Sequence, residues 1–74
     1  MEKLLKILSE VCPGVDFEKE TALIDDGILE SLDIVTIVGE IMSEFDVELT
    51  VDDLLPENFN SARAIMDLIE RRRQ

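Results

Sequence analysis

Apolar residues recur at helical spacing in three segments of the 74-residue chain. The first helix is predicted to cover roughly Glu2 to Cys12, because its apolar side chains fall on one face of a helix. Pro13-Gly14 then ends it, since proline disfavours helix in the residue before it and glycine permits a turn. The apolar face consists of Leu4, Leu5, Leu8, Val11 and Cys12. We interpret Cys12 as a small buried side chain.

The same spacing predicts two further helices. One runs from Ser31 or Leu32 to about Phe45, and its apolar stripe is formed by Ile34, Ile37, Val38, Ile41 and Phe45. The other follows Asn60 or Ser61, either of which can cap its first turn. Its stripe is formed by Ala62, Ile65, Met66 and Ile69. We expect the arginines at positions 71–73 to form a solvated helix end that complements the helix dipole.

The connections between these helices are predicted to be partly ordered. Residues 15–30 are too apolar for a solvated linker, and we expect Phe17, Leu23 and Leu29 to dock onto the helices. Residues 46–49 form a link with room for a brief extended stretch. Thr50, with an acidic residue three positions later, is a candidate cap for a short helical turn that continues through residues 54–55 until Pro56 breaks it.

These elements predict an all-α fold, a small bundle of three main helices plus a short extra helix, with residues 1–74 forming a single domain. The chain has no histidine and one cysteine, which excludes internal disulfides, Ser-His-Asp triads and ordinary zinc sites. So short a chain has little material to enclose a substrate, so we do not expect an enzyme. The region around Asp25-Asp26-Gly27 does not fit an EF-hand, and we expect no metal site.

Charge is distributed unevenly along the chain, whose net charge is −11. Twelve acidic residues and no lysine or arginine lie between Glu20 and Ala62. Such a field repels nucleic acid and anionic membranes and speeds encounter with basic protein surfaces. We therefore expect protein partners with basic docking surfaces, no nucleic acid and no membrane insertion. A cytoplasmic, monomeric protein is the accompanying expectation, because no apolar run approaches a membrane span and no signal-peptide pattern opens the chain.

Ser31 is the candidate functional residue, because a helix N-terminus favours an anion and Asp26-Gly27 turns the chain toward it. It could be an ordinary helix cap, a site of regulatory phosphorylation, or the permanent attachment point of a phosphate-linked group. A catalytic nucleophile is the poorest reading, since no histidine or nearby lysine can activate the hydroxyl.

The stretch Asp26–Val35 resembles the attachment motif of acyl carrier proteins and peptidyl carrier domains, in which an acidic residue, serine and leucine open the second helix. The resemblance extends over essentially the whole chain. It implies that Ser31 receives 4′-phosphopantetheine from coenzyme A through a phosphopantetheinyl transferase. A loading synthetase and downstream acyl-processing enzymes would then use the acyl or aminoacyl thioester in fatty acid, polyketide or related biosynthesis. The residues expected to recognise partners are Glu30, Leu32, Asp33, Thr36 and Glu40.

Some positions depart from the motif of fatty-acid carriers. Glu30 stands where aspartate is usual, and Thr36 and Ser43 stand where acidic residues are usual. The segment Leu55–Ser61, with its aromatic-Asn-Ser sequence, is more similar to D-alanyl carrier proteins, although their usual tryptophan is Phe59 here. A D-alanyl or other aminoacyl carrier in cell-wall or peptide biosynthesis is therefore an alternative. An alternative of another class is a small acidic helical adaptor or inhibitor without a covalent arm.

Overall fold

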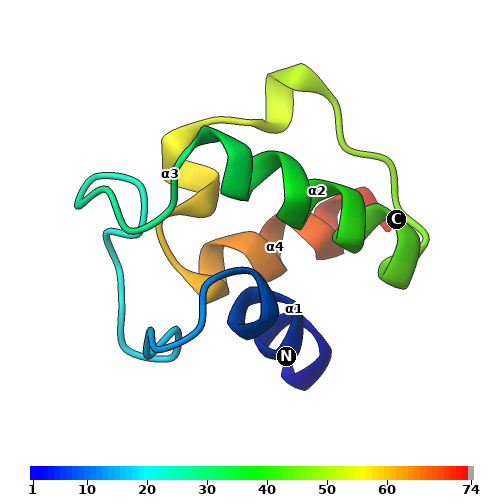
Figure 1. Cartoon of the computed structure of the whole chain (residues 1–74). Helices are drawn as coiled ribbons and strands as arrows, with labels where there is room; N and C mark the ends of the chain where they lie inside the picture. Colours follow the sequence, from blue (N-terminus) through cyan, green and yellow to red (C-terminus); the bar gives the residue numbers. More distant parts are fainter. Residues whose placement is uncertain (74) are drawn as a thin grey trace.

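The computed structural model describes residues 1–73, which form four α-helices and one 3₁₀ turn, and no strand occurs in that range (Figure 1). The elements in chain order are α1 (Glu2–Val11), α2 (Ser31–Phe45), η1 (Val51–Asp53), α3 (Pro56–Phe59) and α4 (Ala62–Arg72). Three helices have 10 residues or more, and α3 has 4. The predicted all-α bundle of three main helices and one short extra helix is confirmed.

The helices bury the stripes that their spacing predicts. Helix α1 packs against α2 and α4, and α3 packs against α4. Each long helix supplies side chains that are entirely buried: Leu4 and Leu8 from α1, Ile37 and Ile41 from α2, Ile65, Leu68 and Ile69 from α4. Burial of this kind contributes about 1.5–3 kcal/mol per large side chain relative to exposure. Ile7 and Leu68 are also buried although the predicted stripes omitted them, since α1 and α4 are covered over a wider arc.

The long connection between α1 and α2 is part of the core. Phe17, Leu23 and Leu29 are at most 4% exposed and pack with the helical residues, as predicted. Ile24 and Ile28 pack against the same cluster while remaining partly exposed. A loop anchored by three buried side chains cannot move as a free linker, because each movement would expose apolar surface.

The structure corrects the predicted end of α1 and the predicted form of the link at residues 46–49. Helix α1 ends at Val11, and Cys12 leaves helical geometry with φ −137° and ψ 81° because Pro13 follows it. Cys12 is half-buried and not fully enclosed. No strand forms at residues 46–49, where the sequence left room for a brief extended stretch. This link begins at Asp46, whose backbone is left-handed, and the side chains of Val47 and Leu49 are buried in the core.

Pro56 begins a helix instead of ending one. Thr50 is the N-cap of η1, as predicted, and its N–H donates to Asp53 at 3.0 Å, but the turn ends at Asp53 and does not reach residues 54–55. Pro56 then occupies the first position of α3, where the missing N–H leaves no helical hydrogen bond unmade and the fixed φ suits the helix.

The C-terminal arginines make structural contacts in addition to forming the predicted solvated helix end. The Asp53 side chain is 3% exposed, and its two carboxylate oxygens each accept from Arg72 Nε at 3.1 Å. Hydrogen bonding from Arg72, followed by that from the Thr50 backbone, holds the pKa of Asp53 below its ordinary value. Arg71 contributes similarly by donating to Asn58 at 3.3 Å. The end of α4 therefore fastens the η1–α3 segment to the bundle.

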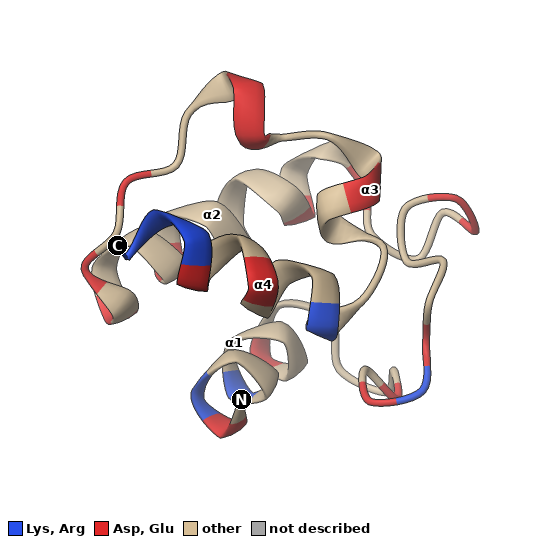
Figure 2. Cartoon of the chain, turned by 180° about the vertical axis from the view of Figure 1, so that it is seen from behind, with Lys and Arg blue, Asp and Glu red and all other residues tan. Residues whose placement is uncertain are grey.

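The basic residues lie on α1, α4 and the first loop, whereas α2, η1 and α3 carry none (Figure 2). The cation-free segment of the sequence thus comprises α2, η1, α3 and the loops beside them, and within it Asp53 is neutralised by Arg72 of α4. Among residues 1–73, no helix is long and apolar enough to cross a bilayer.

Candidate functional site at the start of α2

Ser31 is the first residue of α2 and its side chain is exposed. The residue that caps the helix is Glu30, whose backbone is extended with φ −110° and ψ 174° and whose carbonyl accepts from Ile34 N–H at 3.0 Å. The reading of Ser31 as an ordinary cap is therefore wrong by one position. Its hydroxyl stands beside the outward-pointing N–H groups of the first turn.

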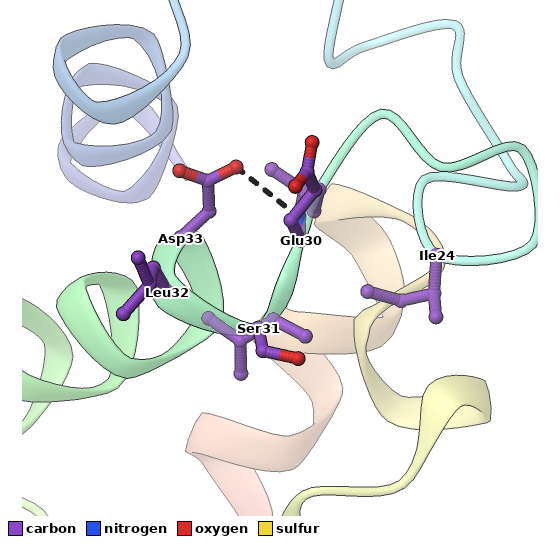
Figure 3. Close-up of a pocket in the computed structure, with 7 residues that line it drawn as sticks. Ile24, Glu30, Ser31, Leu32 and Asp33 are labelled. Carbon is purple, nitrogen blue, oxygen red and sulfur yellow. Dashed lines mark hydrogen bonds between the residues drawn. The ribbon is translucent and has the colours of Figure 1, made fainter.

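The side-chain hydrogen bond at the start of α2 is made by Asp33 and not by Ser31. The Asp33 carboxylate accepts from the Glu30 N–H at 3.1 Å, which is one half of a capping-box arrangement (Figure 3). Because Asp33 satisfies this donor, the start of the helix does not depend on the Ser31 hydroxyl. Within residues 1–73 the structure shows no hydrogen bond that engages that hydroxyl. The side chain is free to react without loss of the helix.

An open, shallow pocket of about 570 Å³ surrounds the serine. Figure 3 shows the Ser31 hydroxyl pointing out from the helix start, with Ile24 of the preceding loop across from it. The pocket is lined by Ile24, Leu29, Glu30, Ser31, Leu32, Asp33 and Ile34. One wall is thus an apolar loop and the other is the first turn of α2. This open shape suits a group that must extend away from the protein.

Backbone hydrogen bonds within the first loop hold together the wall that the loop forms on this pocket. The Leu29 N–H donates to the Leu23 carbonyl at 2.9 Å, and the Gly27 N–H donates to the Ile24 carbonyl at 3.0 Å. Gly27 has a φ of +72°, a left-handed value that glycine adopts without strain, and this confirms the predicted turn at Asp26-Gly27. The turn directs the chain from Leu29 into Ser31.

Asn60 connects this loop to the bundle, a role that the sequence interpretation missed. Asn60 and Ser61 were equal candidates for the cap of α4, and the structure assigns the cap to Ser61, whose hydroxyl accepts from Ala64 N–H at 3.0 Å. Asn60 instead directs its side chain to Ile24 and Asp25. Contacts between residues 35 or more positions apart leave no local pattern by which they could have been found.

The residues expected to recognise partners fall into two groups. Glu30, Leu32 and Asp33 line the pocket with Ser31, whereas Thr36 and Glu40 lie farther along α2 and do not. Leu32 is 81% exposed, so its side chain faces outward. The Thr36 hydroxyl donates to the Leu32 carbonyl at 3.0 Å, and both Thr36 and Glu40 are exposed. The outer face of α2 is therefore open along its length.

Val35 extends the apolar part of this face. It is 64% exposed, because the core takes the side of α2 that carries Ile37, Val38 and Ile41. Two exposed branched side chains, Leu32 and Val35, thus lie next to the serine's helix turn. Exposed apolar side chains with an acidic surround are typical of surfaces that meet protein partners.

Comparison of the sequence with known protein families gives one match. The family described as "Phosphopantetheine attachment site" matches residues 2–69, which is nearly the whole chain. The chain belongs to this family of phosphopantetheine-carrying proteins. A search of curated proteins found none that matches the chain.

Membership explains the general chemistry of the site. The prosthetic group of the family is 4′-phosphopantetheine, and its proteins carry cargo and work with a phosphopantetheinyl transferase and other partner enzymes. The residues in this chain fit the group: an exposed hydroxyl at a helix N-terminus suits a phosphodiester, and the open pocket imposes no enclosure on a long arm.

Proposed function

We propose that Ser31 is the attachment residue and that the chain is a carrier protein for acyl or aminoacyl thioesters. The observation that carries this proposal is the exposed Ser31 hydroxyl at the first position of a helix that Glu30 and Asp33 already cap. The dipole at this end of α2 would favour the phosphodiester by roughly 0.3–1 kcal/mol. When bound, the arm supplies a terminal thiol that forms a thioester with the cargo.

In the attachment step the Ser31 oxygen forms a bond to the phosphorus that bears the pantetheine group of coenzyme A. The pyrophosphate P–O bond breaks, and the adenine nucleotide leaves with the electron pair. We propose that the hydroxyl proton passes to a base on the transferase, which supplies the catalytic groups. The role of the chain is therefore to present the hydroxyl, and partner enzymes perform the chemistry on the arm.

The proposal assigns partner recognition to the open side of the molecule around Ser31. Glu30, Leu32, Asp33 and Thr36 offer acidic and apolar side chains near Ser31, and α2 itself contains no lysine or arginine. Glu40, farther along the helix, lines a shallow pocket with Lys3 and Lys6 of α1. Loading and processing enzymes with basic docking surfaces fit this side by charge. We also propose, as expected from the sequence, that residues 1–74 form one domain and that the protein is a monomer located in the cytoplasm.

The leading cargo class is an acyl group of fatty acid, polyketide or related biosynthesis. The alternative is an aminoacyl group, D-alanyl among them, in cell-wall or peptide biosynthesis. Thr36 and Ser43 weaken an assignment to ordinary fatty-acid synthesis, because both are exposed on the outer face of α2, where fatty-acid carriers usually place acidic residues. The similarity of the Leu55–Ser61 segment to D-alanyl carriers is what favours the aminoacyl alternative. The two classes can be separated by offering the phosphopantetheinylated protein to acyl-loading and aminoacyl-loading synthetases.

The attachment site is tested by mass. The purified protein is incubated with coenzyme A and a broad-specificity phosphopantetheinyl transferase, and its intact mass is compared with that of Ser31→Ala and Ser43→Ala. Ser43 is the matched control, since it is another exposed serine of the same helix. We expect the wild type and Ser43→Ala to gain one phosphopantetheine group and Ser31→Ala to gain none. A gain in Ser31→Ala would show that the arm is attached elsewhere.

An adaptor that acts by binding alone remains the competing class, and it makes the opposite prediction. Such a protein would keep its biological activity in Ser31→Ala, because the substitution leaves the acidic surface and the Glu30–Asp33 hydrogen bond intact. Loss of activity in this variant, with unchanged thermal stability, supports the carrier proposal.

A further inference from the structure

Asn60 makes four hydrogen bonds to three consecutive residues of the first loop. Its side-chain oxygen accepts from the Ile24 N–H at 2.9 Å and from the Asp25 N–H at 3.1 Å. Its amide nitrogen donates to the Asp25 carboxylate at 3.3 Å, and its backbone carbonyl accepts from the Leu23 N–H at 2.8 Å. Both the acceptor and the donor of the amide are thus used on one segment of the chain.

This connection reaches the Ser31 pocket through the loop. Ile24 lines the pocket opposite the serine, and Leu29, which also lines it, is bonded to Leu23. Asn60 itself does not line the pocket. The two ends of the loop wall, near residues 23–25 and at Leu29, are therefore both placed by contacts that begin at Asn60.

We propose that Asn60 is a positioning residue for the modification of Ser31, because it holds the Ile24 wall of the attachment pocket in the orientation that the transferase binds. The inference rests on the proposed function of Ser31 and adds a residue outside the attachment motif, on the junction between α3 and α4. Asn60 acts through the loop and touches neither the hydroxyl nor the arm.

Removal of the side chain should affect binding more than the chemical step. Asn60→Ala removes the three side-chain hydrogen bonds to Ile24 and Asp25 but keeps the backbone bond to the buried Leu23. The exposed part of the loop at residues 24–25 can then adopt other conformations, and the transferase has to order it on binding. The Ser31 hydroxyl keeps its place, because Glu30 and Asp33 fix the start of α2 independently. The expected effect of Asn60→Ala is about a tenfold rise in the KM of the transferase for the protein, which is the 1.4 kcal/mol of one or two net hydrogen bonds. The value of kcat should change by less than about twofold, since no contact made only in the transition state is removed.

The neighbouring residue provides a control for stability alone. Ser61→Ala removes the cap of α4 and destabilises the same region, but the hydroxyl that it removes is bonded to Ala64 and not to residues 23–25 of the loop. Transferase kinetics are measured with coenzyme A on the wild type, Asn60→Ala and Ser61→Ala at a temperature at which circular dichroism shows all three folded. We expect the KM of Ser61→Ala to equal that of the wild type. Equal rises in both variants would reduce Asn60 to a general stabilising residue and overturn the inference.

A second set of variants exchanges the partners of one hydrogen bond. Asn60→Asp keeps an acceptor for both N–H groups but places a carboxylate against the Asp25 carboxylate, so it should raise KM. Adding Asp25→Asn restores a donor opposite the new carboxylate and should return KM to within about twofold of the Asp25→Asn variant alone. Failure of this rescue would also overturn the inference, and the comparison decides the case if Asn60→Ala does not fold.

The outcomes separate this inference from the function on which it rests. If the wild type gains no phosphopantetheine, the proposed function fails. If the wild type is modified and Asn60→Ala has the same KM and kcat, the proposed function stands and the positioning role of Asn60 is refuted.

Discussion

Leu23 and Leu32 are the same residue type in opposite environments, so one substitution made at both tests how the molecule divides core from partner surface. Leu23 belongs to the first loop and is entirely buried, whereas Leu32 belongs to α2 and is 81% exposed. We expect Leu23→Ala to destabilise the fold strongly and Leu32→Ala to leave it nearly unchanged. A reading based on secondary structure alone, in which helical residues matter more than loop residues, predicts the reverse.

The magnitudes follow from burial. Leu→Ala at a fully buried site removes apolar burial and leaves a cavity, which costs about 2–5 kcal/mol. A chain of this size is stable by roughly 4–11 kcal/mol, so Leu23→Ala consumes a large part of the total. For a domain of 60–100 residues this corresponds to a fall in Tm of about 8–40 °C. Leu32→Ala removes little buried surface and should change the free energy of unfolding by less than about 0.5 kcal/mol.

Urea unfolding followed by circular dichroism at the helix band, together with thermal melting, measures both variants against the wild type. If Leu23→Ala is unfolded without denaturant, Leu23→Met provides the value, with an expected cost below about 1.5 kcal/mol because volume is conserved. Equal losses at the two positions, or a stable Leu23→Ala, would refute the assignment of the first loop to the core.

Further consequences concern charge and capping. The pKa of Asp53 is lowered mainly by its hydrogen bonds from Arg72, so its ionised form stabilises the fold above the ordinary value of 3.8 and this contribution is lost as the pH falls through the lowered pKa. The wild type should therefore exceed Asp53→Asn in unfolding free energy by the largest amount at pH 7, and this difference should shrink below pH 3.8. A difference that stays constant from pH 7 to pH 2 would contradict the ion pair. Sodium chloride or magnesium chloride should raise the Tm by screening the acidic residues of the cation-free segment, and an unchanged Tm between low and moderate salt would count against that field. Ser61→Ala should cost about 1 kcal/mol through the lost cap of α4, as read by urea unfolding, while Ser43→Ala on exposed α2 serves as its neutral reference.

The helices could be predicted from the sequence because their signals are local. Apolar spacing identified α1, α2 and α4, and Ser61 and Thr50 behave as the caps that their residue types indicate. The errors lie where two local signals compete. Pro56 follows a candidate helical turn and was read as its end, although a proline fits equally well at the first position of a new helix, which is where it lies.

The local geometry around Ser31 follows in part from the sequence, whereas the long-range contacts that hold it do not. The start of α2, the turn at Gly27 and the exposed outer face of α2 follow from residue type and spacing. Residue type alone favours Ser31 as the cap, but the structure has Glu30 there, with its N–H donating to the Asp33 carboxylate. The contacts of Asn60 with Asp25, and of Arg72 with Asp53, join residues 35 and 19 positions apart, and only the packing of the bundle brings them together.

The central claim is that Ser31 carries the arm, and fragmentation of the modified protein tests it most directly. After treatment with coenzyme A and a phosphopantetheinyl transferase, the protein is digested and each peptide is analysed for the phosphopantetheine group by tandem mass spectrometry. We expect one modified residue, Ser31, with Ser9, Ser43 and Ser61 unmodified. Modification at any of these other serines, or an unmodified Ser31 in a protein that has gained the group, would contradict it.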